Sequence, residues 1–238
     1  QDHSLRVPRP DLSQSLGSPN ACTQCHADKK PAWAASVMDK WYGKAWRERP
    51  HYGTTLKAGE TRGALALPGL LELAASPTAP AVVRATAATL AQPYANPATL
   101  PAARALLQDK DPSVRIAALG LLAPLDVANR VLGAAPLLAD PVRGVRIEAA
   151  QILADVPDSQ LPDGKRGARQ AALQEFEAAL MQESDWPATN VNLGNLRLRQ
   201  GRTDEAVAAY ERAIRLDPRF TAGYINLADL WRLQGRET

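Results

Sequence analysis

Cysteine and histidine are scarce in this chain of 238 residues, which has only two cysteines and three histidines. If both cysteines serve one site, no thiol remains for a disulfide, a thiolate nucleophile or a four-ligand metal site. A Ser-His-Asp triad, a glycine-rich phosphate loop and paired carboxylates in a cleft pattern are also not evident. The sequence therefore gives no sign of hydrolytic or phosphate chemistry.

Aromatic residues make up only 5% of the chain, while alanine and leucine dominate. This composition favours packed helices over a β-sandwich, so we predict an all-α fold. No apolar run approaches the roughly 20 residues that span a bilayer, and no membrane span is expected. The net charge of +3 is mild and the arginines are scattered, which gives no reason to expect nucleic-acid binding.

The clearest motif that is present is the pentapeptide C-T-Q-C-H at 22–26. In a C-x-x-C-H pattern the two thiols bond to the vinyl groups of a haem, and the adjacent imidazole binds its iron. We predict that Cys22, Cys25 and His26 hold one covalent haem c, with His26 as the proximal ligand. A thioredoxin-like redox pair would need neighbouring strands, and a zinc site would need a second ligand pair, which the two remaining histidines do not form.

The chain starts with Gln1 and shows no basic stretch followed by an apolar one, which is the pattern of a leader sequence. We therefore expect a mature chain or a fragment. Since bacterial c-type haem is attached outside the cytoplasm, the expected location is periplasmic or extracellular.

Residues 1–60 form the predicted haem-binding segment. Three prolines, together with several serines and one glycine, make residues 1–21 irregular, with extended backbone rather than helix. Pro31 begins a predicted helix that runs towards Gly43, with its apolar face at positions 34, 37, 38 and 41.

Aromatic residues gather in and after this helix. Trp33, Trp41 and Tyr42 are the predicted lining of the porphyrin face, and the alternative is that these rings form the core of a small lobe together with Trp46. Three basic residues are candidate partners of the haem propionates: Lys44, Arg47 and Arg49.

Two histidines are candidates for the second axial ligand of the iron. We prefer His3, because an ordered proline-rich terminus needs a tether and Asp2 could orient the imidazole. His51 is the alternative, and a hairpin could fold it back to the haem. Met38 is expected in the core, and Met181 lies in a distant helical module.

From about residue 63 the chain becomes repetitive. Val-Arg pairs recur at 83, 114 and 145, an interval of 31 residues, and alanines follow in phase at 87, 118 and 149. Such self-similarity is typical of an α-solenoid, in which each helix pair buries its face against its neighbours. The stretch 111–119 resembles HEAT-like repeats, so we predict about three helical hairpins over 63–156. Arg84, Arg115 and Arg146 are expected to reach acidic or carbonyl partners along the stack.

A second period follows a stretch with linker composition at 157–164. We predict tetratricopeptide-like repeats over 165–238, the last of them incomplete, so that a further segment or a partner is expected to cover its first helix. The residues that fit the period of about 34 residues are Leu193, Gly194, Gly201, Ala206, Tyr210, Ala213 and Pro218.

Three features in this order carry a family resemblance: D-H-S-L-R-V-P-R-P-D-L-S at 2–13, P-N-A-C-T-Q-C-H at 19–26, and the helical repeats. Together they resemble the C-terminal part of bacterial multihaem c-type cytochromes related to the cytochrome c-554 group. The resemblance implies that further haem motifs precede this region and that the Asp-His of the first motif is an axial-ligand position. Only one haem motif is present here. If upstream haems belong to a missing segment, His3 or His51 serves one of them instead.

The preferred function is an electron-transfer c-type cytochrome module rather than an enzyme, with a bis-histidine haem on a docking scaffold. Expected partners are a redox protein, other cytochrome subunits or a second copy bound through the repeats. The alternatives are a haem enzyme or gas sensor with an open iron position, and a repeat adaptor with a structural haem.

Overall fold

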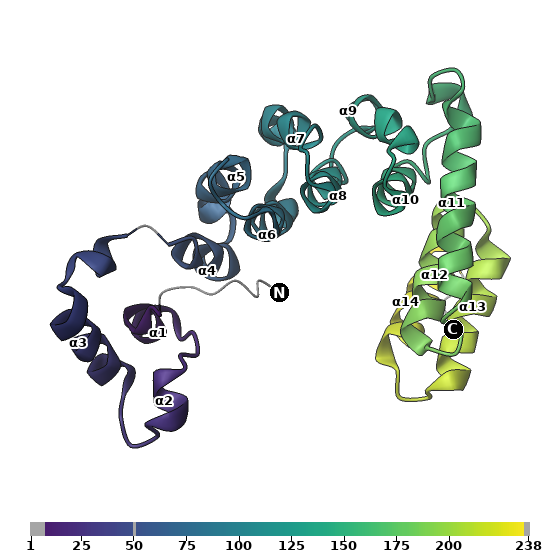
Figure 1. Cartoon of the computed structure of the whole chain (residues 1–238). Coiled ribbons are helices and arrows are strands. Elements are labelled where there is room, and N and C mark those ends of the chain that lie inside the picture. Colours follow the sequence, from purple (N-terminus) through teal and green to yellow (C-terminus); the bar gives the residue numbers. More distant parts are fainter. Residues whose placement is uncertain (1–7, 50, 236–238) are drawn as a thin grey trace. The chain divides into compact units, whose positions relative to one another are not determined.

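The computed structural model describes residues 8–49 and 51–235, and over this part of the chain it contains helices and no strand (Figure 1). The all-α prediction is confirmed. The chain divides into two compact units, Gln1–Leu121 (unit 1) and Leu122–Thr238 (unit 2). No helix in the described ranges is long and apolar enough to cross a membrane.

Unit 1 begins with a small lobe that carries the haem motif. The helices α1 and α2 both pack against α3, and Trp46 of the following 3-10 turn is buried with Ala35 and Met38 in the lobe's core. The expected core position of Met38 is confirmed, with 7% of the residue exposed. The elements are α1 (Pro10–Leu16), α2 (Cys22–Cys25), α3 (Pro31–Tyr42) and η1 (Ala45–Glu48).

The helix α1 corrects the prediction that residues 1–21 are irregular. Pro10 occupies the first turn of this helix, where a missing N–H costs nothing, and Asp11 complements the helix dipole there. Gly17 ends the helix in the left-handed conformation (φ 71°), and its N–H donates to the Ser13 carbonyl. The prediction is therefore wrong for residues 10–16, where Pro10 starts a helix, while residues 17–21 are non-helical as predicted and residues 1–7 lie outside the described part.

The predicted helix from Pro31 towards Gly43 is confirmed as α3, but its predicted apolar face is wrong at one position. Ala34 and Met38 are buried, whereas Trp41 is 71% exposed. The ring that packs on Met38 comes instead from Trp46, after the helix has ended.

The remaining helices of unit 1 and the first ones of unit 2 are helical repeats. The helices α6, α8 and α10 begin at residues 81, 112 and 143, which reproduces the interval of 31 residues. The in-phase valines and alanines are all at most 4% exposed, which confirms that they form the inner face. The bounds are α4 (Gly53–Thr61), α5 (Leu67–Ala75), α6 (Ala81–Ala91), α7 (Leu100–Leu106), α8 (Pro112–Gly120), α9 (Val127–Ala134) and α10 (Arg143–Ile152).

The repeated arginines have the structural partners that we expected. Arg84 forms a bidentate ion pair with Asp109, with one contact at 3.1 Å. Arg115 and Arg146 each donate to backbone carbonyls just before their own helices, at 2.8–3.2 Å. Arg146 also pairs with Glu175 at 2.9 Å. The HEAT-like character of these hairpins stays a prediction.

Unit 2 ends in four further helices, and the last three share a core around Tyr210, which is fully buried. Gly194 lets the Tyr210 ring lie directly on the backbone of the preceding helix, where no side chain would fit. The bounds are α11 (Lys165–Met181), α12 (Pro187–Arg199), α13 (Thr203–Leu216) and α14 (Thr221–Leu233).

Candidate functional site

The predicted haem-attachment motif forms a single helical turn. The N–H of His26 donates to the Cys22 carbonyl (2.9 Å) and closes the turn, while the Asn20 side chain accepts from the Thr23 N–H (3.1 Å) near its start. Because residues three apart in a helix lie on one side, Cys22 and Cys25 share a face. The first is half-buried and the second exposed, and both are free thiols.

The donor set fits a covalent haem. His26 is exposed, and its ring makes no hydrogen bond to any residue within 8–49 or 51–235. Two accessible thiols on one face and an adjacent free imidazole are what attachment at two vinyl groups and one iron position requires. Within the same ranges no three His, Cys, Asp or Glu side chains gather as a metal site, so a zinc site would lack further ligands there.

The aromatic residues predicted to line the porphyrin have two different environments. Trp33, in the first turn of α3, packs against the His26 ring with ring centres 4.8 Å apart and planes tilted by 57°. Trp41 and Tyr42 lie eight and nine residues further on, about 12 Å along the helix axis. They contact each other edge to face at 6.4 Å and are 71% and 66% exposed. The alternative that the rings form the lobe core is therefore correct for Trp46 and wrong for Trp41 and Tyr42.

The guanidinium groups of two arginines lie over the ring of Trp46. The guanidinium groups of Arg47 and Arg9 lie 5.3 and 5.8 Å from the ring centre. Arg47 also binds both carboxylate oxygens of Asp39 at 2.7 and 2.9 Å, and this bond holds the pKa of Asp39 below its ordinary value. Arg47 is thus engaged within the lobe by Asp39, and the pairing of any of the three basic candidates with a haem propionate stays a prediction.

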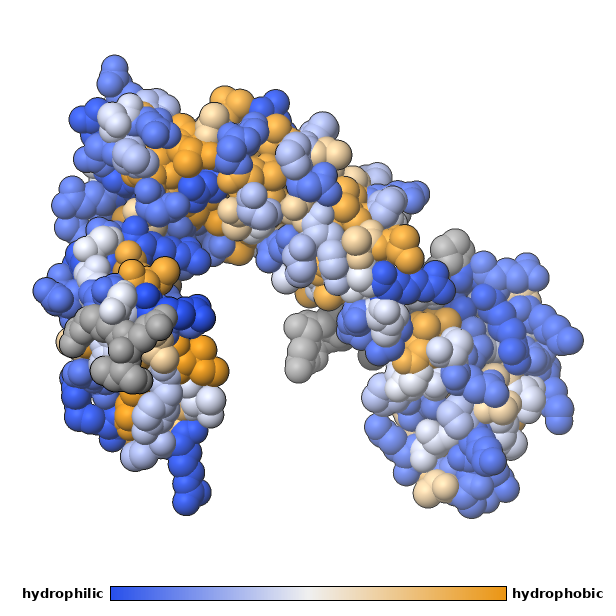
Figure 2. Space-filling view, turned by 180° about the vertical axis from the view of Figure 1, so that it is seen from behind, coloured by the Kyte–Doolittle hydropathy of each residue, from blue (hydrophilic) through white to orange (hydrophobic). Residues whose placement is uncertain are grey.

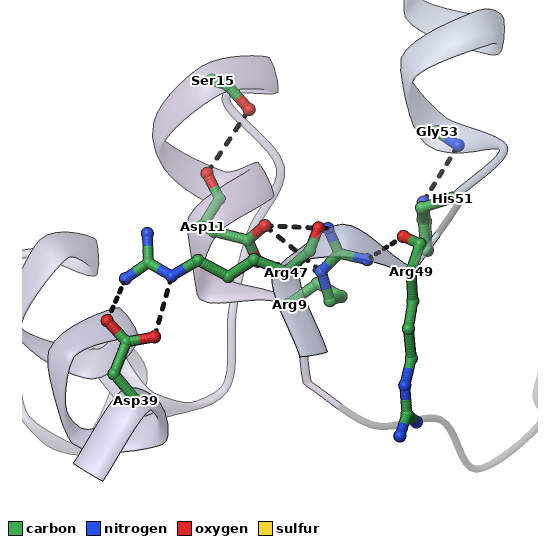
Figure 3. Close-up of polar contacts among 8 residues, drawn as sticks. All are labelled: Arg9, Asp11, Ser15, Asp39, Arg47, Arg49, His51 and Gly53. Atoms are coloured by element: carbon green, nitrogen blue, oxygen red, sulfur yellow. Dashed lines mark hydrogen bonds and ion pairs between the residues drawn. The ribbon is translucent and has the colours of Figure 1, made fainter. Parts of the chain in front are cut away.

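The two candidate distal ligands are not equivalent. His3, the preferred one, lies outside the described residues. His51 precedes α4, stacks on Tyr52 at 4.5 Å and accepts the Gly53 N–H on its Nδ1 at 3.0 Å (Figure 3). A neutral imidazole that binds iron through Nε2 carries its proton on Nδ1, so this hydrogen bond would have to break.

The surroundings of His51 also differ from those of the haem motif. It lines a pocket of about 420 Å³ together with Tyr52 and residues of α4, α5 and the turn between α5 and α6. None of the lining residues belongs to α2 or α3. The structure therefore places His51 in a pocket of the repeat region. Of the two methionines, Met38 is in the core and Met181 is half-exposed in unit 2.

A second polar cavity lies in unit 2 and was not predicted from the sequence. It has a volume of about 250 Å³, and polar residues spaced three and four apart on α12 form one wall. The hydroxyl of buried Tyr210 donates to Asn195 Oδ1 at 2.8 Å, which fixes the amide. The only sequence signal was the helical spacing of these polar residues. The lining residues are Gln151, Phe176, Asn192, Asn195, Leu196 and Arg199.

Glu148 on α10 gives a testable electrostatic prediction for unit 2. Burial raises the pKa of its carboxyl, and the positive charge of Arg199 opposes this rise only in part. Because the folded-state pKa is raised, ionisation costs stability as the pH rises through it. Glu148→Gln is therefore expected to raise the melting temperature at pH 7, and the gain should vanish near pH 4. Glu183→Gln, at an exposed position, is the control and should show no such gain.

Comparison with known proteins bears on one part of the chain. The tetratricopeptide repeat model matches residues 189–220, which cover most of α12 and α13. No curated protein and no solved structure matches the chain. The match confirms the tetratricopeptide prediction for this segment. Together with the 31-residue period of the earlier helices it is consistent with a helical-repeat protein, and tetratricopeptide repeats suggest interaction with other proteins.

Proposed function

We propose that this chain is an electron-transfer c-type cytochrome module, with one haem c held by Cys22, Cys25 and His26 on a helical-repeat docking scaffold. The observation that carries the proposal is the exposed helical turn that presents two free thiols beside an accessible imidazole. A bound haem supplies a one-electron couple at its iron. The chain anchors it through two cysteine sulfurs, binds the iron through His26 and packs Trp33 against that histidine.

The proposed second axial ligand is His3, in keeping with the resemblance to multihaem cytochromes. With both axial positions filled, no site remains for a substrate, so the module passes electrons and is not itself an enzyme. The hydrogen bond that occupies Nδ1 of His51 supports His3 over His51.

The hydrogen bond at Nδ1 of His51 also supports a second candidate function. If His3 does not bind the iron, the occupied Nδ1 of His51 leaves the position opposite His26 open, and the chain becomes a haem enzyme or a sensor of a small gas. The two functions differ in one measurable property, which is the access of carbon monoxide to the reduced iron.

The repeats are the proposed docking surface for a redox protein or other cytochrome subunits. Hydrophobic residues reach the surface along the helical repeats on the face seen in Figure 2. Leu65 in unit 1 and Leu132 in unit 2 are 87% and 61% exposed. Such side chains lose solvent contact when a partner binds. We propose a periplasmic location, because covalent attachment of haem takes place there.

The test is expression in a bacterial periplasm with the c-type maturation machinery. We expect one haem per chain that stays attached under denaturing conditions, and none in the Cys22→Ser, Cys25→Ser double variant. A wild-type chain without covalent haem would contradict the proposal. For the reduced protein we expect no rapid binding of carbon monoxide, rapid binding after His3→Ala, and no change after His51→Ala. Rapid stoichiometric binding by the wild type would favour the enzyme or sensor.

A further inference from the structure

The main chain of His26 is fixed on both sides, whereas its ring has one aromatic neighbour among the described residues. The N–H donates to Cys22 and the carbonyl accepts from Lys29, both at 2.9 Å. The ring itself makes no hydrogen bond to the described residues, and its one aromatic neighbour there is Trp33, at 4.8 Å. Rotation of the imidazole about its Cβ–Cγ bond is therefore limited by Trp33.

Trp33 is well placed to limit this rotation because it belongs to a rigid element. It lies in the first turn of α3, where its N–H donates to the Lys30 carbonyl (2.9 Å) and its own carbonyl accepts from Ser36 Oγ (2.8 Å). The next two residues of the helix, Ala34 and Ala35, are buried in the lobe at 2% and 1% exposed. A movement of the Trp33 ring would thus require a movement of α3 or a change of rotamer.

We propose that Trp33 is the positioning residue of the proximal histidine and sets the orientation of the His26 imidazole plane above the haem. The inference rests on the proposed function. Histidines that bind metals are usually oriented by a hydrogen bond from their second ring nitrogen to a carboxylate or carbonyl. No described residue supplies that acceptor here, and the tilted ring contact with Trp33 takes its place.

This role makes a specific spectroscopic prediction. The plane of an axial imidazole determines how it mixes with the iron d orbitals, so a ring that turns freely gives a different and broader set of g values. Free rotation of the imidazole also changes the reduction potential of the haem, because the axial ligand is one of the groups that set this potential. A residue that only covers the haem or fills the lobe would leave the orientation of the imidazole unchanged.

The test compares haem-loaded Trp33→Leu and Trp33→Phe with a matched control, Trp186→Leu, which removes a tryptophan ring that is 65% exposed in unit 2, outside the haem lobe. We expect haem loading to equal that of the wild type in all three. Trp33→Leu should shift and broaden the largest g value of the ferric protein and shift its potential, Trp33→Phe should do so less, and Trp186→Leu should do neither.

Unchanged g values and potential in loaded Trp33→Leu would overturn the positioning role while leaving the proposed function intact. A wild-type chain without covalent haem would overturn both. If Trp33→Leu does not load haem, Trp33→Phe decides alone: a shift in its g values supports the role, and wild-type g values overturn it.

Discussion

Replacement of Arg84 by alanine is expected to destabilise unit 1 by about 3 kcal/mol or more. Arg84 is 7% exposed on the inner face of α6, and its guanidinium binds both carboxylate oxygens of Asp109, 25 residues later in the chain. The other contact of Asp109 is the N–H of Asp111 at 2.9 Å. Without Arg84 a largely buried carboxylate would remain with one hydrogen bond, and an unpaired buried charge is costly.

Chemical denaturation of Arg84→Ala measures this loss, with Arg104→Ala as the control. Arg104 is exposed on α7 and forms no ion pair with the described residues, so its removal should change stability by less than about 0.5 kcal/mol. Hydrogen exchange should assign the loss to α6 and α8, which pack on each other. Equal stability of the two variants would show that the ion pair contributes nothing.

The pH dependence of this variant follows from Asp109. The hydrogen bond from Arg84 holds the pKa of the Asp109 carboxyl below its ordinary value. A lowered pKa contributes stability that is present above the unfolded-state pKa and is lost as the pH falls through the folded-state pKa. The difference between wild type and Arg84→Ala should therefore be largest near neutral pH and shrink in acid.

The helical repeats could be predicted from the sequence because each of their inner positions recurs. The valines, alanines and arginines repeat at 31 residues, and a periodic pattern averages out local exceptions. The partner of Arg84 was predictable only as an acid or a carbonyl, since Asp109 lies in the turn after α7. Which residue a side chain reaches depends on the packing of helices that are distant in sequence.

The haem lobe was harder to predict because it has no repeat. The motif at 22–26 could be found from spacing alone, whereas the burial of Trp46 in place of Trp41 depends on how the chain turns after α3 ends. The engagement of Arg47 by Asp39 was missed for the same reason. The helix start at Pro10 could have been predicted, because proline and aspartate are both favoured in the first turn of a helix.

Replacement of Gly194 by alanine is expected to destabilise unit 2 by about 2 kcal/mol. A Cβ at this position of α12 would lie 2.6 Å from Cδ1 and 2.9 Å from Cζ of Tyr210, closer than van der Waals contact. The Tyr210 ring cannot yield easily, because it is fully buried and its hydroxyl is held by Asn195 at 2.8 Å. The strain outweighs the better helix propensity of alanine, which is worth about 1 kcal/mol.

The matched control, Gly167→Ala, is expected to change the stability of the protein in the opposite direction. Gly167 lies in α11 with open space where its Cβ would be, so Gly167→Ala should raise stability by up to about 1 kcal/mol. Denaturation of the two single variants separates steric strain from helix propensity. In a Tyr210→Leu background the cost of Gly194→Ala should fall, because the shorter side chain leaves room for the methyl group. An undiminished cost in that background would mean that the strain at Gly194 does not come from Tyr210, and that this packing contact does not explain the glycine.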